Sequence, residues 1–511
     1  MISIINSFGL DGINGYIVTV EVDAGNGMPM FEIVGLPDIA VKESRQRIKS
    51  ALKNTKIDLP AKKYVVNLAP ADLKKEGAVY DVPIAIGVIS SLGLVSFENL
   101  SESMFLGELS LTGEIRKVKG VLPAAICAKK QGIKNVFVPK DNAAEAAMVD
   151  GISVFPCNSI KDIILHFTKE NVITPIEVDV KQYFNASEEL ECDFSEVKGQ
   201  ENVKRALEIA AAGGHNCLLI GSPGSGKTML AKRLPTILPD LTLEEALEVT
   251  KIHSVAGILP QQTPIITKRP FRSPHHTTST VALSGGGSVP KPGEVSLAHH
   301  GVLFLDEFPE YKKEAIEVLR QPLEDCTVTV SRVQSTMTYP CNFMLIAAMN
   351  PCKCGYYGDP NHECTCTEHQ INQYLSRISG PVLDRIDLHI EINPVQYDDL
   401  EEKSVSESSK EIKKRVNAAR EIQQRRFKSD GIFSNSQMTT KHIKKYCNLG
   451  TQENLLLKVA FEKLGLSARA YDRILKVART IADLDKSDDI KTKHISEAIQ
   501  YRNLDRKYWN R

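Results

Sequence analysis

The 511-residue sequence lacks the long apolar runs that membrane-spanning helices require. It contains no stretch of about 18 consecutive apolar residues, and no charged segment followed by an apolar core stands at its start. With 42% hydrophobic and 25% charged residues, the composition is ordinary for globular domains, and the length suits about three of them. We therefore expect a cytoplasmic protein without a membrane partner.

An overall charge is also absent, since Lys and Arg number 63 and so do Asp and Glu. The charge is nevertheless distributed unevenly, because residues 401–511 hold 25 basic against 15 acidic side chains. A basic end can contact polyanions, but a charge excess more often marks a solvated helical face. Charge alone therefore does not select a partner.

A disulfide framework is not expected, because the eleven cysteines of a cytoplasmic chain stay reduced. Four of them form two Cys-x-Cys pairs separated by nine residues: Cys352, Cys354, Cys364 and Cys366. Thiolates with this spacing can converge on one tetrahedral Zn²⁺, which would fix a loop with little core of its own. Free thiols and redox use are the alternatives, and His362 is either a substitute ligand or, the interpretation we favour, a loop histidine. We favour structural zinc.

One motif is complete: residues 221–228 read GSPGSGKT, the GxxxxGK[ST] pattern of a phosphate-binding loop. It follows an apolar, strand-like run (216–220) and opens a helix-like stretch. Glycines let the backbone wrap around phosphates, and N–H groups at the helix start face the anion. Lys227 would reach the β- and γ-phosphates, and the Thr228 hydroxyl would bind Mg²⁺. The predicted nucleotide-binding residues are Gly221, Ser222, Pro223, Gly224, Ser225, Gly226, Lys227 and Thr228.

A second apolar stretch, 301–305, ends in the two carboxylates Asp306 and Glu307, which is the Walker B pattern. Asp306 would hold Mg²⁺. Glu307 would orient and polarise the attacking water, because phosphoryl transfer depends on positioning and charge neutralisation. A third apolar stretch, 344–349, precedes Asn350, whose side chain would sense the γ-phosphate. The alternative for Asn350 is a loop-starting residue before Pro351.

Three arginines are candidates for contacts with the phosphates. Arg385 fits a finger that reaches the γ-phosphate of a neighbouring subunit; its alternative is an ion pair with Asp384 or Asp387. Arg377 is a second candidate for the same role. Arg469 begins a predicted helix from which it would reach back to the phosphates as part of a lid, unless it is a surface arginine.

The order of phosphate loop, Walker B, Asn350, Arg385 and helical end resembles an AAA+ ATPase. Four stretches (271–277, 285–287, 292–299 and 301–307) resemble the magnesium-chelatase ATPase subunit. Two more (34–38 and 67–77) resemble the amino-terminal part of the YifB/ComM family of magnesium-chelatase-like AAA+ proteins. The resemblance implies a ring-forming, usually hexameric homo-oligomer driven by ATP and Mg²⁺. It also implies DNA as a partner, because the best-understood bacterial members are helicases that extend branch migration during natural transformation.

Three domains are expected on this basis. Residues 1–166 resemble the proteolytic domain of Lon (a ribosomal S5 domain 2-like α/β fold), residues 167–192 form a linker, residues 193–395 an AAA+ core with a parallel sheet, and residues 396–511 an α-helical lid. In Lon, a nucleophilic serine and a lysine occupy the places of Val79 and Leu122. Valine is no nucleophile and Lys119 lies three positions early, so a non-proteolytic domain that binds nucleic acid or assists ring assembly is expected.

Residues 326–340 alternate on both sides of a polar centre, which predicts a β-hairpin. Related helicase-type AAA+ proteins push such a hairpin into the pore of the ring, where Arg332 would grip phosphates without reading sequence. The alternative is a plain sheet hairpin. We favour a ring-forming DNA helicase, with a chelatase-like motor that remodels a protein partner as the second hypothesis.

Overall fold

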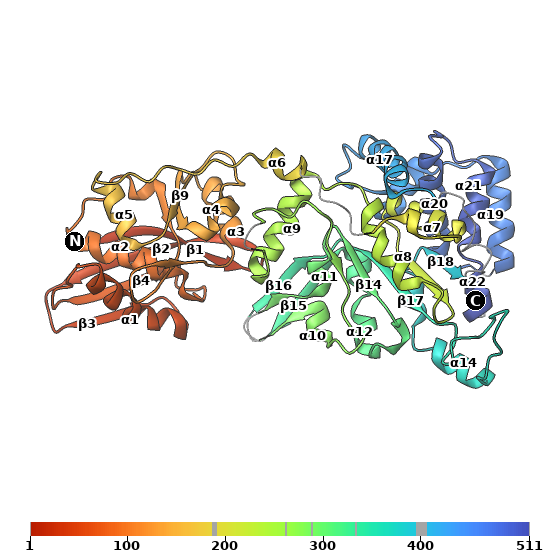
Figure 1. Cartoon of the computed structure of the whole chain (residues 1–511), viewed down its shortest axis with the longest axis horizontal. Helices are drawn as coiled ribbons and strands as arrows, with labels where there is room; N and C mark the ends of the chain where they lie inside the picture. Colours follow the sequence, from red (N-terminus) through yellow and green to blue (C-terminus); the bar gives the residue numbers. More distant parts are fainter. Residues whose placement is uncertain are drawn as a thin grey trace. The chain divides into compact units, whose positions relative to one another are not determined.

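The computed structural model describes residues 2–185, 192–260, 263–287, 290–332, 335–394, 406–464 and 466–509. The chain divides into two units, Met1–Ala186 with Leu243–Thr267 and Ser187–Thr242 with Lys268–Arg511 (Figure 1). The segment Leu243–Thr267 therefore groups with the first unit, whereas the expected boundaries place it in the ATPase core. Each unit is described by itself below.

A seven-stranded mixed sheet forms the first unit, with the strand order β3-β4-β2-β1-β5-β8-β9. β2 pairs antiparallel with β1 and β4, and the other neighbours are parallel. Apolar residues alternate along β2, so Val18, Val20 and Val22 are buried on one face, against α2. The strands are β1 (Ser3–Asp11), β2 (Asn14–Gly25), β3 (Met30–Val34), β4 (Lys63–Ala69), β5 (Ser103–Phe105), β8 (Asn135–Pro139) and β9 (Ser153–Cys157), beside the small hairpin of β6 (Glu108–Leu109) and β7 (Ile115–Arg116).

Local capping and apolar faces define the helices of this unit. α1 begins after Asp38, whose carboxylate accepts the N–H of Val41 at 2.8 Å. α9, from the inserted segment, packs on α3, and its Lys251 donates to Asn14 at 2.7 Å. The helices are α1 (Ile39–Asn54), α2 (Asp81–Ser91), α3 (Val121–Lys130), α4 (Lys140–Ala146), α5 (Ile160–Phe167), α6 (Val180–Asn185) and α9 (Leu243–Ala256).

The second unit contains a five-stranded parallel sheet with the order β11-β14-β17-β10-β18. The expected α/β class with a parallel sheet is confirmed. β10, β14 and β17 are buried at every position, as in strands covered on both faces. The strands are β10 (Cys217–Gly221), β11 (Phe271–Arg272), β14 (Val302–Leu305), β17 (Met344–Met349) and β18 (Leu388–Ile392).

Around this sheet lie short helices and two hairpins. The expected hairpin is formed by β15 (Thr327–Arg332) and β16 (Ser335–Pro340), with Thr327 opposite Pro340. The side chain of Arg332 and residues 333–334 lie outside the described part of the chain. The other hairpin joins β12 (Gly285–Gly286) and β13 (Lys291–Pro292). The helices are α7 (Glu201–Gly213), α8 (Lys227–Arg233), α10 (Thr280–Ser284), α11 (Glu294–Leu297), α12 (Lys313–Val318), α13 (Pro322–Asp325), α14 (Glu368–Leu375) and α15 (Gly380–Leu383).

In the described residues 406–464 and 466–509, the carboxy-terminal part contains helices joined by turns and loops, and no strand. α20 begins after Ser467, whose hydroxyl accepts the N–H of Ala470 at 3.2 Å, and its apolar face packs against α7 and α17. These helices are α17 (Ser409–Arg426), α18 (Thr440–Tyr446), α19 (Thr451–Leu464), α20 (Ala468–Leu484), α21 (Thr492–Gln500) and α22 (Leu504–Trp509). In the described ranges, none of the helices has the length and apolarity needed to cross a membrane.

Candidate nucleotide-binding site

The carboxyl ends of three neighbouring parallel strands bring the predicted nucleotide-binding residues together. β17 lies between β10 and β14. The register pairs Ile220 with Met349 and Leu305 with Ala347, so the phosphate loop, Asp306 and Asn350 follow their strands at one edge of the sheet. Ligands of open parallel sheets bind at this edge.

Lys227, the first residue of α8, connects two of these motifs. Its buried Nζ donates to the backbone oxygens of Gly221 at 2.8 Å and Ser222 at 2.9 Å, and to Oδ1 of Asn350 at 3.1 Å. Burial lowers the pKa of Lys227, and the charge of Asp306 opposes that shift. The ammonium is therefore fixed at the edge of the phosphate loop, beside Asn350.

The phosphate loop has the shape of an anion cradle. Gly224 and Gly226 have φ of +79° and +90°, a conformation that glycine adopts without steric cost. A Cβ added at Gly224 would meet no atom within 4 Å, so the loop is open there. One added at Gly221 would lie 2.5 Å from the backbone oxygen of Ile392. The open backbone and the fixed lysine fit the phosphates of a nucleotide.

The two predicted magnesium ligands are in direct contact. Thr228 Oγ1 donates to Asp306 Oδ2 at 2.6 Å, and Asp306 Oδ1 accepts the backbone N–H of Glu307 at 2.9 Å. Hydroxyl and carboxylate oxygens are the hard ligands that Mg²⁺ takes in nucleotide sites. Thr228 and Asp306 therefore fit one shared cation.

His276 contacts the predicted catalytic carboxylate. His276 Nδ1 lies 2.9 Å from Glu307 Oε2. The segment before it is held in place because the Tyr311 hydroxyl donates to the backbone oxygen of Pro274 at 2.6 Å. His276 follows β11, and the pairing of β11 with β14 in the structure, which the sequence does not show, brings it to Glu307.

Arg385 is buried rather than exposed at a subunit edge. Its guanidinium pairs with Glu324 and donates to the backbone oxygen of Pro381 at 2.8 Å. Asp387, one of the two carboxylates expected as alternatives, contacts Arg473. Burial lowers the pKa of Arg385, and the charges of nearby arginines, Arg469 first among them, lower it further.

The other two arginines have different surroundings. Arg377 is 49% exposed and pairs with Glu310 at 2.6 Å. Arg469 stands exposed in the first turn of α20, close enough for its charge to act on Arg385. The structure therefore groups Arg469 with Arg385. Among the interactions of the described residues, none joins it to the phosphate loop on its own subunit.

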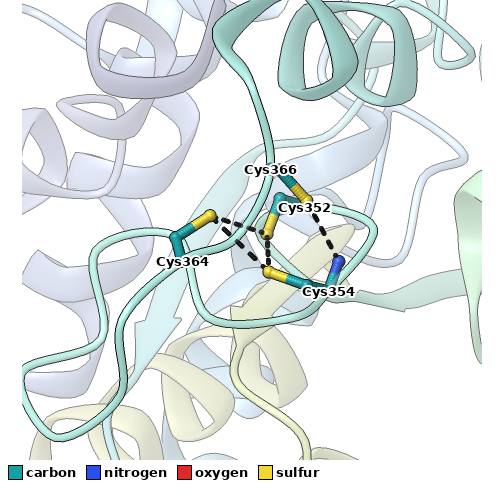
Figure 2. Close-up of side chains that lie close together, drawn as sticks. All are labelled: Cys352, Cys354, Cys364 and Cys366. Carbon is teal, nitrogen blue, oxygen red and sulfur yellow. Dashed lines mark hydrogen bonds between the residues drawn. The ribbon is translucent and has the colours of Figure 1, made fainter.

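All four predicted zinc ligands converge (Figure 2). Their sulfur atoms lie within 4.8 Å of one another. Cys352 Sγ is 3.3 Å from that of Cys354 and 3.7 Å from that of Cys364, and Cys354 and Cys364 are 3.6 Å apart. A tetrahedral ion with Zn–S bonds of about 2.3 Å holds its sulfurs about 3.8 Å apart. The cluster could therefore hold a metal ion.

Backbone groups around the cluster favour a thiolate. Burial raises the pKa of Cys354, but the N–H groups of Tyr356 and Thr365 and the neighbouring thiols lower it to about 6. Cys366 Sγ accepts the N–H of Cys354 at 3.4 Å. Hydrogen bonds from the backbone to ligand sulfurs are typical of the surroundings that hold a metal.

The positions compared with the Lon dyad carry no nucleophile in the first unit. Val79 lies in a short 3₁₀ turn (Ala78–Tyr80), and Leu122 is buried in α3. Lys119 is exposed just before that helix. These side chains offer no hydroxyl for a lysine to activate.

Family models of the magnesium chelatase match three parts of the chain. "Magnesium chelatase, subunit ChlI" matches residues 193–400, "Subunit ChlI of Mg-chelatase" matches residues 20–142, and "Magnesium chelatase, subunit ChlI C-terminal" matches residues 406–502. These matches support an ATPase activity and, with it, ATP and Mg²⁺ at the site described above.

Curated relatives match nearly the full length. The chain is 44% identical over 508 residues to "Uncharacterized protein YifB" of Escherichia coli, covering 99% of this chain and 98% of that protein. It is 42% identical over 495 residues to "Competence protein ComM" of Haemophilus influenzae, covering 96% and 95%. A partial match, 24% identical over 50% of this chain and 32% of the other, joins it to "DNA replication licensing factor mcm7" of Schizosaccharomyces pombe. The chain belongs to the YifB/ComM family of magnesium-chelatase-like AAA+ proteins.

Proposed function

We propose that this chain is a ring-forming, ATP-driven DNA motor, a helicase that promotes branch migration. The observation that carries the proposal is the convergence of Lys227, Thr228, Asp306 and Asn350 at one sheet edge. It occurs in a chain 42% identical to a protein named for competence and partly similar to a replication factor. An ATP-driven motor must act on a second molecule besides ATP, and those two names favour DNA as that molecule.

Each residue has a task set by its position. Bound ATP and Mg²⁺ supply the phosphoanhydride bond and part of the charge neutralisation. Lys227 binds phosphate oxygens from the loop, and Thr228 and Asp306 hold the cation. Glu307 orients the attacking water, and Asn350 contacts the γ-phosphate while it fixes Lys227.

The arginines support a site that two subunits share. Arg385 and Arg469 lie close together, and among the described residues no interaction joins Arg469 to the phosphate loop of its own chain. We assign both to the neighbouring subunit's γ-phosphate, Arg385 once it leaves its pair with Glu324, with Arg377 as the alternative finger. A homo-oligomeric ring, a hexamer by family resemblance, then completes each site. Its subunit number can be measured by native mass spectrometry with and without ATP.

The decisive experiment measures ATP hydrolysis by the purified chain with and without single-stranded and branched DNA. Strand displacement is followed in parallel, with Glu307→Gln as the control that binds ATP but cannot orient water. We expect hydrolysis to rise with DNA and displacement to require Glu307. Hydrolysis that ignores both DNAs would favour the second candidate, remodelling of a protein partner. The three chelatase-subunit family matches are the observation that supports this candidate.

The hairpin of β15 and β16 is the proposed DNA contact, with Arg332 at the end of β15. Arg332→Ala should keep nucleotide affinity and lose DNA stimulation, and the salt slope of DNA binding should fall by about 1. Lys458→Ala is the matched control, because it removes an equal charge from an exposed position of α19. An unchanged salt slope for Arg332→Ala would contradict the contact.

We also propose that the four cysteines hold a structural Zn²⁺. Metal analysis of the purified chain should find one zinc per subunit, and a variant carrying both Cys364→Ser and Cys366→Ser should lose it. Wild-type protein that contains no metal would contradict the zinc site.

We propose that the first unit is a non-proteolytic domain that binds nucleic acid or assists ring assembly. Mutation of Lys119 should therefore leave any background peptidase signal unchanged.

A further inference from the structure

The segment that carries the cysteines, residues 351–366 (the cysteine loop), packs directly against the phosphate loop. A Cβ added at Gly355 would lie 2.6 Å from Cδ and 2.7 Å from Cγ of Pro223. At Gly355 φ is +92°. Only a residue without a side chain lets the Pro223 ring come so close to the backbone of Gly355. Pro223 of the phosphate loop therefore packs on the cysteine loop.

A buried carboxylate makes a second contact between the two loops. The side chain of Asp359 is 2% exposed and accepts the backbone N–H groups of Asn361 at 2.8 Å and His362 at 3.1 Å. The neighbouring Ser222 hydroxyl and those N–H groups lower the pKa of this carboxylate. Ser222 also offers its backbone oxygen to Lys227 at 2.9 Å. Asp359 therefore acts on a residue of the phosphate loop that holds the lysine.

The same loop continues directly from the predicted sensor. Asn350 accepts from Lys227 at 3.1 Å and is followed by Pro351 and the buried Cys352. Burial raises the pKa of Tyr374, in the helix α14 that follows the cysteine loop, and the backbone N–H of Asn350 opposes that shift. The segments on both sides of the cysteine loop therefore lie near Asn350.

No helix or strand occurs between the end of β17 at Met349 and the start of α14 at Glu368, a stretch that the structure describes in full. Much of it is exposed, including Lys353 and the residues 360–363. A loop with so little core keeps one conformation at a large entropic cost unless a cross-link shortens it. The converging thiols are the cross-link that this stretch has, once they share a metal ion.

We propose that the metal-loaded cysteine loop positions the phosphate loop, so that metal binding and nucleotide binding strengthen each other through Asp359. This inference rests on the proposed metal and nucleotide sites and adds the coupling between them. Thermodynamic linkage makes the coupling reciprocal: the factor by which metal raises nucleotide affinity equals the factor by which nucleotide raises metal affinity. Asp359 is a positioning residue, since it touches neither ligand.

The test uses the full-length chain loaded with zinc. Nucleotide affinity is measured with a fluorescent, non-hydrolysable ATP analogue before and after removal of zinc by a zinc-selective chelator, with Mg²⁺ kept in excess throughout. In parallel, zinc transfer to a chelating dye is followed with and without the unlabelled analogue. We expect both affinities to change by the same factor, between about 5 and 150, the usual range of coupling between sites.

Variants separate coupling from loss of either site. Asp359→Ala should keep one zinc per subunit, because all four thiolates remain, but its nucleotide affinity should fall and become insensitive to the metal. Asp359→Asn should restore the coupling, since its side-chain carbonyl oxygen can still accept the N–H groups of Asn361 and His362. Glu363→Gln, a charge-neutralising change at an exposed position of the same loop, should behave as the wild type.

The outcomes are distinguishable. Protein that takes up no zinc would overturn the metal site and the coupling with it, and protein that takes up zinc but no nucleotide would overturn the nucleotide site. Protein that binds both, with nucleotide affinity equal before and after metal removal, would overturn the coupling alone. If the coupling in Asp359→Ala is as large as in the wild type, Asp359 does not transmit it.

Discussion

Replacing Gly355 with alanine should disturb the nucleotide site through Pro223, while the four cysteines, Lys227 and Thr228 stay unchanged. The new methyl group would stand 2.6 Å from Cδ of Pro223, whereas carbon atoms in contact are separated by about 3.5 to 4.0 Å. Gly358 provides the control within the same loop, because its φ of +77° is similar and a methyl group there would meet only the flexible end of Lys507 at 3.8 Å.

Both variants bear the energetic cost of backbone strain, and only Gly355→Ala also bears the cost of overpacking. A left-handed backbone costs an alanine about 1 to 2 kcal/mol, and both positions bear it. Only Gly355→Ala also overpacks a site, at about 1 to 3 kcal/mol, against a rigid proline ring that belongs to the phosphate loop. If Pro223 moves to relieve the overlap, ATP affinity falls by about 5- to 150-fold, since 1.4 kcal/mol is a factor of ten.

The assay compares ATP affinity by titration calorimetry and the unfolding midpoint in urea for both variants and the wild type, with zinc content checked in each. Gly358→Ala should keep wild-type ATP affinity and lose stability only. Equal ATP affinity in the two variants would refute the reasoning, because the contact with Pro223 would then carry no strain into the nucleotide site.

Two further substitutions test contacts that the structure brings together. His276→Ala should raise basal ATP hydrolysis by no more than about fivefold. The substitution frees Glu307 from a partly exposed ion pair that is worth at most about 1 kcal/mol. Unchanged or reduced hydrolysis would mean that His276 does not restrain Glu307. Asp387→Asn should destabilise the second unit by about 3 to 5 kcal/mol in urea unfolding, because it leaves Arg473 in a buried pair without its charge partner. Burial raises the pKa of Asp387, but Arg473 and a neighbouring histidine lower it well below its usual range, so the contribution is present above about pH 4 and is lost as pH falls through the folded pKa. A pH-independent effect of the substitution between pH 2 and pH 7 would contradict this assignment.

The nucleotide site was accessible from sequence because its parts follow strands. A phosphate loop, an acidic pair and an asparagine that each end an apolar run must meet once the runs form neighbouring parallel strands, and β10, β14 and β17 are such neighbours. The four cysteines were accessible for a similar reason, since short spacing limits how far apart the thiols can lie. At the strand ends and at the cysteine pairs, a short sequence motif is therefore enough to predict which side chains lie together.

Contacts between distant segments had no such signal. The pairing of β11 with β14 decides that His276 reaches Glu307. The amino-acid sequences of the strands do not reveal their order in the sheet. The contact of Pro223 with Gly355 depends on how an irregular loop folds back. The segment Leu243–Thr267 lies between parts of the ATPase core in sequence, yet its helix packs with the first unit, because an amphipathic helix can bury its face on any complementary surface.

The charge balance around Arg385 favours it over Arg377 as the residue that meets a neighbouring nucleotide. Four arginines gather near α13 and the start of α20, and three carboxylates pair with three of them: Arg320 with Glu317, Arg385 with Glu324 and Arg473 with Asp387. The fourth, Arg469, has no carboxylate partner among the described residues. Burial lowers the pKa of Arg385 most, and the charges of Arg469, Arg320 and Arg473 lower it further. Arg377 is half-exposed and already balanced by Glu310. An anion brought by a second subunit would relieve the repulsion at Arg385 and Arg469 together, and a triphosphate has the charge to do so.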